Sequence, residues 1–292
     1  MRAMIVKELR SYLRGARPFV LISVYLLVLG GILLLVYATE ADSPFVNRSS
    51  LGTMIYVVVF GLALLQLTFL TPAMNASALG GERDRQTIDL LLVAPIKPWM
   101  LVVGKLAAPC LFLLLLSLAT VPLAGIAFLI GGIELRDLLV GLLLLVLTTL
   151  SYGSIGIWAA ASARSSRSST MLAQGIVFML AIGVPVVAFV VLGLLVNNAD
   201  EGFAEWLLTS QIVRWPAVIL MSLSPFVGLA SWLVALESGD LSLTHTMPND
   251  VGGGKIPVLW VMSLIVWSVL IPLLLWRSAR ALPRSVARSG GG

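Results

Sequence analysis

The chain has 292 residues, of which 59% are hydrophobic and 11% are charged, and its formal net charge is +5. Soluble proteins are roughly 45–50% apolar and roughly 25% charged, so this composition excludes a water-soluble globular protein. The mean hydropathy of +1.03 agrees with that exclusion. One cysteine, Cys110, and one histidine, His245, also exclude an intramolecular disulfide and a metal site built from histidine and cysteine.

The first segment, residues 1–17, predicts a basic amphipathic helix that lies in the membrane interface. Ile5 and Leu9 share one face of that helix, while Lys7 and Arg10 share another. A simpler interpretation stays open, because cationic residues before the first span also serve as an orientation signal.

Residues 18–292 are predicted to form one transmembrane domain of six helices, so the fold class is an all-α polytopic membrane protein. A membrane-spanning helix needs about 20 apolar residues, and six stretches have that length. The predicted spans are 19–38, 51–73, 106–130, 138–161, 171–196 and 256–276.

Within these boundaries the spans contain no Asp, Glu, Lys, Arg or His. Ion-coupled carriers and proton relays keep ionisable groups inside the bundle, and intramembrane hydrolases need a nucleophile with a base or a metal. The sequence therefore argues against both classes, and we expect no catalytic residues.

Uncharged polar side chains in the spans are candidates for contact with a substrate. We single out Gln66 and Thr71 in the second span and Gln174 in the fifth. The alternative is that these groups form hydrogen bonds between helices.

Small residues and prolines predict how the helices pack and bend. Gly153 and Gly156 in the fourth span permit close approach of a neighbouring helix. Three prolines, Pro122, Pro185 and Pro272, are positioned to kink the third, fifth and sixth spans.

The loop 197–255 is predicted to lie outside the membrane as a cap on the bundle. It contains one further apolar stretch, at 215–236. Pro216 and Pro225 interrupt that stretch, so a re-entrant or interfacial hairpin fits better than a seventh span. A seventh span would also place one of the two arginine-rich termini outside.

The distribution of positive charge predicts the orientation. With six spans, one side of the membrane holds fifteen of the nineteen Lys and Arg residues, all but Arg48, Arg136, Arg214 and Lys255. By the positive-inside rule that side is cytoplasmic and contains both termini. Its charge suits anionic lipid headgroups, and we expect no nucleic-acid partner.

The connection between the second and third spans is the most informative local segment. We expect Gly80-Gly81 to end the second span, a surface helix to form from about 84 to 93, and Pro95 to terminate it. The apolar side of this helix, including Leu91, can pack on the bundle while the charged residues face the cytoplasm. Such a helix can transmit the movement of a docked soluble protein into the spans.

This segment resembles the permease subunits of ABC-2 type ABC transporters. Their pattern of Glu-Arg, Gly-Thr, Leu-Leu, small residue, Pro, Ile or Val, and Gly-Lys is matched here, except that Gln86 replaces the usual glycine. The matching residues are Glu82-Arg83, Thr87, Leu91-Leu92, Ala94-Pro95-Ile96 and Gly104-Lys105. The N-terminal helix, the six-span plan and Ser224-Pro225-Phe226 extend the resemblance along the chain.

The resemblance implies that residues 82–96 form a coupling helix, which docks on a separate ATP-binding cassette ATPase. The coupling residues it implies are Glu82, Arg83, Asp84, Thr87, Leu91 and Pro95. The chain itself carries no phosphate-binding loop, because neither Gly104-Lys105 nor Gly254-Lys255 is followed by Ser or Thr. We therefore expect no enzyme and no cofactor in this chain, with ATP and Mg bound by the partner.

Two hypotheses follow for the function. In the first, the chain pairs with a second permease subunit, identical or different, in the cell inner membrane and forms an export path for a hydrophobic or amphipathic substrate. In the second, it transports nothing and passes the motion of the ATPase to a partner outside the cytoplasm.

Overall fold

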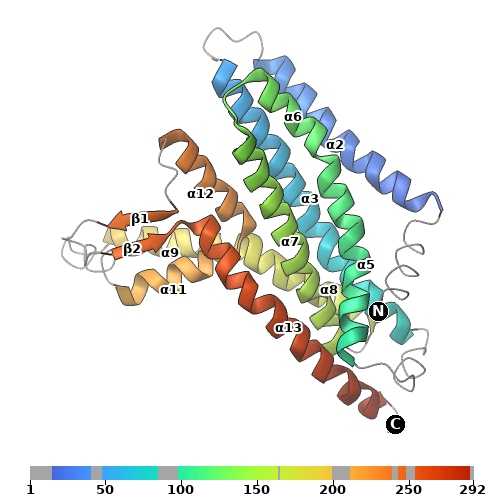
Figure 1. Ribbon diagram of the computed structural model, residues 1–292. Helices are drawn as coiled ribbons and strands as arrows, with labels where there is room; N and C mark the ends of the chain where they lie inside the picture. Colours follow the sequence, from blue (N-terminus) through green and yellow to red (C-terminus); the bar gives the residue numbers. More distant parts are fainter. Residues whose placement is uncertain are drawn as a thin grey trace. The chain divides into compact units, whose positions relative to one another are not determined.

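The computed structural model consists mainly of long helices, and its described residues include one short strand pair (Figure 1). It describes residues 15–40, 48–84, 98–163, 165–198, 211–238, 243–247 and 254–289. The predicted N-terminal helix up to residue 14 lies outside this part of the chain. The elements are α2 (Arg17–Glu40), α3 (Arg48–Asp84), α5 (Pro98–Ala119), α6 (Val121–Ile130), α7 (Leu135–Ser162), α8 (Ser166–Phe178), the π-helix η1 (Met179–Gly183), α9 (Val184–Asn198), α11 (Gln211–Met221), α12 (Pro225–Ser238), β1 (Thr244–Met247), β2 (Gly254–Pro257) and α13 (Leu259–Ser289).

Among the described residues, six helical segments are long and apolar enough to cross a membrane, in agreement with the six predicted, and a bent helix pair would make a seventh if it spans. The six are Pro18–Thr39, Ser50–Glu82, Pro98–Ile130, Leu135–Ser162, Ser166–Leu195 and Leu259–Leu282. All six are longer than predicted, and the longer boundaries include ionisable residues that the predicted spans did not contain. Lys105 and Asp137 lie inside helices with only 3% and 1% of their surface exposed.

Two of the three predicted kinks coincide with breaks in helical geometry, whereas α13 continues through Pro272 without a break. α5 ends at Ala119 and α6 begins at Val121, one residue before Pro122, whose missing N–H and fixed φ suit the first turn of a helix. The π-helix η1 ends at Gly183, two residues before Pro185. A π-bulge widens the helix locally and marks a point where its backbone pairing changes.

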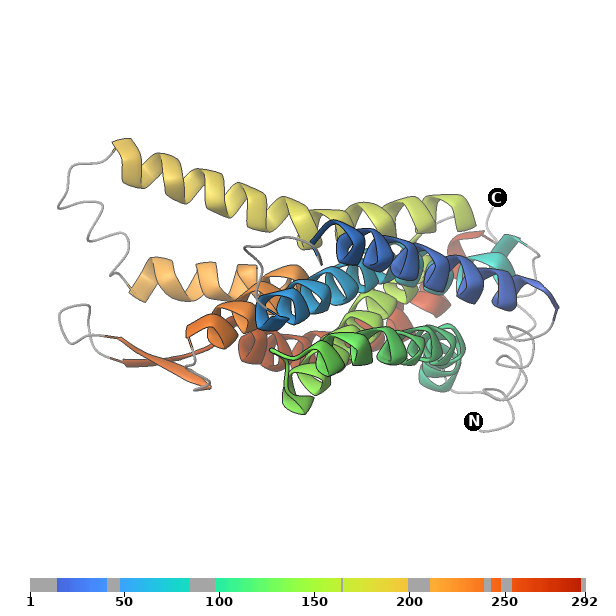
Figure 2. The same cartoon turned by 90° about the horizontal axis from the view of Figure 1, so that it is seen from above.

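The chain forms two compact units, the first made of residues 1–177 and 271–292. In this unit α3 runs through the middle and packs most extensively on α7, and also on α2, α5 and α6 (Figures 1 and 2). The predicted glycine contact is confirmed. A Cβ on Gly156 would lie 2.9 Å from Pro72 O, and one on Gly153 would lie 2.9 Å from Cys110 Sγ.

Several buried hydroxyl groups in this unit have hydrogen-bond partners. Tyr25 of α2 and Thr120, at the break between α5 and α6, share a hydrogen bond of 2.7 Å between their oxygens. Tyr56 Oη donates to the backbone carbonyl of Asp137 at 2.9 Å. These bonds offset the desolvation of polar groups inside an apolar bundle.

The second unit, residues 178–270, contains a bent pair of helices. α11 and α12 meet at an angle of 105° over the predicted stretch 215–236. The bend lies just before Pro225, which begins α12, whereas Pro216 lies inside α11 and does not interrupt it. The predicted break is thus confirmed at only one of the two prolines, and the choice of a hairpin over a seventh span stays a prediction.

Serine hydroxyls donate hydrogen bonds to backbone carbonyls around this bend. Ser224 Oγ donates to the carbonyl of Ala181 in η1 at 2.7 Å, and Ser263 Oγ of α13 donates to the carbonyl of Ser222 at 2.6 Å. The two serines within the break, Ser222 and Ser224, are fully buried. Backbone groups freed by a bend or a π-bulge must find partners when they are buried, and these hydroxyls provide them.

Next in the chain is a short antiparallel strand pair, which the all-α prediction did not include. In β1 and β2, Thr244 faces Pro257 and Met247 faces Gly254 (Figure 2). Each strand has four residues, too few to show the alternation by which strands are recognised in a sequence.

Candidate functional site

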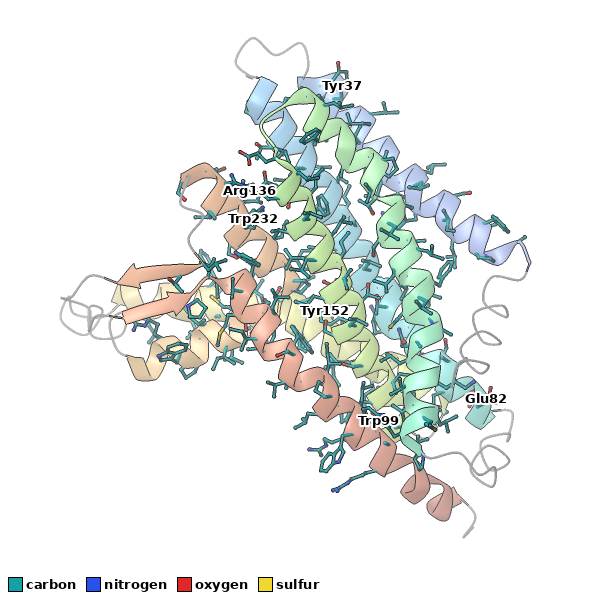
Figure 3. The ribbon with its side chains drawn as sticks, in the orientation of Figure 1. Tyr37, Glu82, Trp99, Arg136, Tyr152 and Trp232 are labelled. Atoms are coloured by element: carbon teal, nitrogen blue, oxygen red, sulfur yellow. The ribbon has the colours of Figure 1, made fainter. Side chains whose placement is uncertain are left out.

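The predicted coupling segment joins the end of α3 to the start of α5. Three of its predicted contact residues lie outside the described residues, namely Thr87, Leu91 and Pro95. The side chain of Arg83 also lies outside them. Glu82 and Asp84 are described, in the last turn of α3. Figure 3 shows Glu82 at the same end of the first unit as Trp99 in the first turn of α5. We call this end, where α3 ends and α5 and α8 begin, the basic end.

The glycine pair before this segment does not end the second span, contrary to the prediction. α3 continues through Gly80 and Gly81 to Asp84. Gly80 has a packing role, because a Cβ there would lie 2.9 Å from Ser166 Cα and 2.9 Å from Ser169 Oγ. The missing side chain allows the first turn of α8 to lie directly against α3.

Glu82 forms an ion pair with the next helix. Lys105 Nζ donates to Glu82 Oε1 at 2.9 Å, and the side chains are 4% and 26% exposed. An ammonium group buried to this degree is stable only when it is paired, so Glu82 is the counter-ion that permits Lys105 inside α5. The carboxylate that we expected to face the cytoplasm is therefore engaged within the bundle.

Asp84 contacts a third helix. The backbone N–H of Ser166, the first residue of α8, donates to Asp84 Oδ1 at 3.1 Å. The first N–H groups of a helix have no partner inside it, and a carboxylate also complements the positive end of the helix dipole. Asp84 therefore caps α8 from outside, although its side chain remains exposed to solvent.

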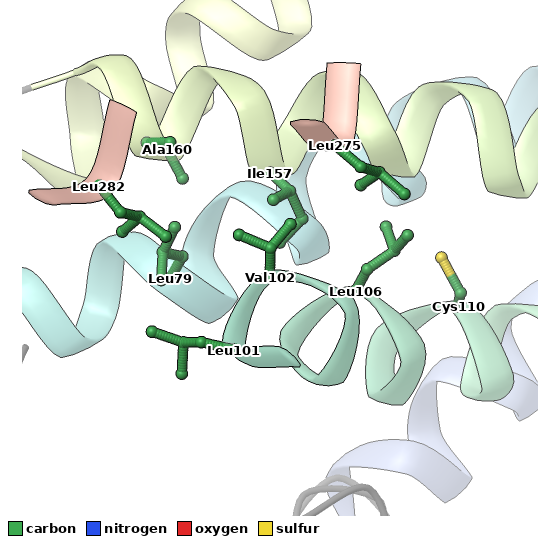
Figure 4. Close-up of a cluster of buried hydrophobic side chains, with 10 residues drawn as sticks. Leu79, Leu101, Val102, Leu106, Cys110, Ile157, Ala160, Leu275 and Leu282 are labelled. Carbon is green, nitrogen blue, oxygen red and sulfur yellow. The ribbon is translucent and has the colours of Figure 1, made fainter. Parts of the chain in front are cut away.

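A cluster of apolar side chains underlies these polar contacts and joins four helices at the basic end (Figure 4). The cluster comes from α3, α5, α7 and the last part of α13. Its buried members are Leu79, Leu101, Val102, Leu106, Cys110, Ile157, Ala160, Ala161, Leu275 and Leu282. The segment 85–97 thus leaves from, and returns to, a closely packed part of the bundle.

The three residues predicted as substrate contacts share an unusual property. Gln66 Nε2 and Thr71 Oγ1 on α3 and Gln174 Nε2 on α8 are buried, and no described residue forms a hydrogen bond with them. The alternative role, hydrogen bonding between helices, is therefore not seen for these atoms. A buried polar group without a partner costs about 1–3 kcal/mol, so each favours a partner from outside the described chain.

Two residues that contact the predicted coupling residues were not predicted from the sequence. They are Lys105, which binds Glu82, and Ser166, which binds Asp84. Lys105 was noted only as part of the Gly-Lys pair. A lysine in the second turn of an otherwise apolar helix, Pro98–Ala119, is itself a signal, because burial requires a counter-ion nearby. The sequence contains no comparable signal for Ser166, whose backbone forms the contact.

The fold is that of a multi-span membrane protein, and its family follows from comparison with known proteins. A family model described as ABC-2 family transporter protein matches residues 2–279. The chain therefore belongs to the ABC-2 transporter family and is a transmembrane subunit without an ATPase domain of its own. No curated protein matches the sequence.

Proposed function

We propose that this chain is the permease subunit of an ATP-driven exporter and forms the path for a hydrophobic or amphipathic substrate. Residues 82–96 dock on a separate ATP-binding cassette ATPase, which binds ATP and Mg, and a second permease subunit completes the path. The observation that carries this proposal is a charged segment set between two spans of an ABC-2 family chain that has no phosphate-binding loop. Force on that segment acts directly on α3 and α5.

The proposed orientation places the basic end and both termini in the cytoplasm, with the chain in the inner membrane. The concentration of fifteen of the nineteen Lys and Arg residues on one side supports it. Figure 3 agrees with alternating spans, because Glu82 and Trp99 lie at one end of the first unit and Tyr37 lies at the other.

Gln66, Thr71 and Gln174 are proposed to contact the substrate. Their unpartnered buried atoms support this role, since such atoms gain most from a ligand that brings hydrogen-bonding groups into an apolar setting. An amphipathic molecule offers such groups together with an apolar body, whereas a naked ion does not.

A second candidate function is transmission of ATPase motion to a partner outside the cytoplasm, without transport. The second compact unit supports it, because the bent pair α11–α12 and the strand pair belong to the predicted outer segment. In this function unit 2 contacts the partner, and no substrate moves.

The test is co-expression of the chain with the ATPase encoded beside it, followed by reconstitution in vesicles and measurement of ATP-dependent movement of fluorescent amphipathic dyes. Leu91→Asp is expected to abolish co-purification of the ATPase, because it places a charge on the proposed docking helix. Leu243→Asp is the matched control, since Leu243 is exposed and lies in the predicted outer segment.

The outcomes separate the two functions. Stimulated ATP hydrolysis without dye movement favours the non-transporting function. A chain that binds no ATPase at all contradicts both functions.

A further inference from the structure

The last turn of α3 carries two carboxylates that point to different neighbours. Successive residues of a helix are about 100° apart, so side chains at positions i and i+2 diverge by about 200°. Glu82 accepts its hydrogen bond from Lys105 of α5, and Asp84 accepts its bond from Ser166 of α8. One helix turn therefore holds two other helices at once.

Both contacts lie beside the connection 85–97. Asp84 is the residue immediately before this connection, and Lys105 lies in the second turn of α5, which begins immediately after it. The Glu82–Lys105 pair therefore closes the two ends of the connection on each other. Separating the ends requires exposing or unpairing Lys105, whose side chain is 4% exposed.

The contact with α8 is reinforced by the shape of the backbone. Gly80 lies one turn before Asp84 and has no room for a Cβ against Ser166 and Ser169. Farther along the same interface, Ala76 and Ala173 are both completely buried in one small apolar cluster. α8 is thus held to α3 by a cap, a close approach and a packed alanine pair.

We propose that Glu82 and Asp84 are positioning residues that fix α5 and α8 to the end of α3, so that the three helices move as one body when the connection 85–97 is displaced. This inference rests on the proposed function of that connection. It is separate from docking, because it concerns the bonds of the two carboxylates to α5 and α8 of this chain.

The test measures the separation of α5 and α8 by pulsed EPR between spin labels at Met100→Cys and Met171→Cys. Both positions are exposed, at 40% and 68%, and both belong to the first unit. The full chain carries Cys110→Ala and is studied in lipid nanodiscs, alone and with its ATPase, with and without MgATP and vanadate. A single narrow distance distribution is expected, and its width should not change with nucleotide.

In the chain without ATPase, Glu82→Ala should broaden the distribution strongly, and Asp84→Ala should broaden it to a smaller but measurable extent. The charge swap Glu82→Lys with Lys105→Glu should restore the narrow distribution, which a role in packing alone does not predict. Arg277→Ala is the control, since it removes an exposed charge from the part of α13 in the same unit and should leave the distribution narrow.

Three results overturn the inference. They are a narrow distribution in Asp84→Ala, a swap variant that stays broad, and reduced ATPase binding in Glu82→Ala with an unchanged distribution, which would make Glu82 a docking contact. Failure of the unmodified chain to bind an ATPase contradicts the proposed function only, because the distances in the chain alone still decide whether the carboxylates hold the three helices together.

Discussion

Two interruptions of the helical bundle are stabilised in different ways. At the basic end, where α3 gives way to the connection 85–97, the chain uses a carboxylate–ammonium pair and a carboxylate cap. At the bend between α11 and α12 it uses neutral hydroxyls, Ser224 and Ser263.

The degree of exposure explains the difference. Glu82 is 26% exposed and Asp84 is open to solvent, so their charges keep part of their hydration. Ser224 is 0% exposed, and a charge there would lose nearly all of its hydration. At these two interruptions, carboxylates that remain in contact with water serve at the rim, and hydroxyls serve in the interior.

The largest effect is expected from Glu82→Ala. Removal of Glu82 takes away a carboxylate that compensates the buried Lys105 charge. We expect a loss of about 3 kcal/mol of unfolding free energy in mixed micelles, at the low end for a buried pair because Glu82 is partly exposed. Lys105→Met should cost less, about 1 kcal/mol, because the carboxylate that remains can reach water. Equal losses for the two variants would contradict the assignment of Lys105 as the buried partner.

Gly80→Ala should have the next largest effect. The new methyl group meets the backbone of Ser166, so we expect overpacking to cost about 1–3 kcal/mol, measured in the same unfolding experiment. Gly81→Ala is the adjacent control, because nothing lies within 4 Å of its Cβ position. It should stabilise α3 by up to about 1 kcal/mol through helix propensity. If both variants behave alike, Gly80 has no packing role.

Ser224→Ala tests the hydroxyl side of the comparison. The carbonyl of Ala181 loses its donor while it stays buried, and we expect about 1–2 kcal/mol of destabilisation. Ser268→Ala provides the control, since its hydroxyl is exposed and bonds to Ile265 O within its own helix. A stability of Ser224→Ala equal to that of the control would show that the bend does not depend on this bond.

The smallest effect is expected from Asp84→Ala, which removes the cap of α8 at an exposed position. We expect a loss of about 0.5–1 kcal/mol and faster amide hydrogen exchange in the first turn of α8. Asp84→Asn retains an acceptor and should keep most of the protection. Unchanged hydrogen exchange in Asp84→Ala would show that Asp84 does not stabilise the first turn of α8.

The sequence by itself determined the class of protein, the six long apolar helices and the family. These depend on the length of apolar runs and on local motifs, such as Leu91-Leu92 with Pro95, which can be recognised without knowing any contact. The close approach at Gly153 and Gly156 was also predictable, because small residues in a span have few other roles.

Only the tertiary structure decided which groups satisfy one another. Glu82 and Lys105 are 23 residues apart, Ala181 and Ser224 are 43 apart, and Asp84 and Ser166 are 82 apart. Local pattern cannot specify such pairs, because many donors and acceptors in the chain are chemically equivalent. Gly80-Gly81 shows the same limit. Two glycines favour the end of a helix in isolation, but the packing of α8 against Gly80 keeps α3 continuous to Asp84.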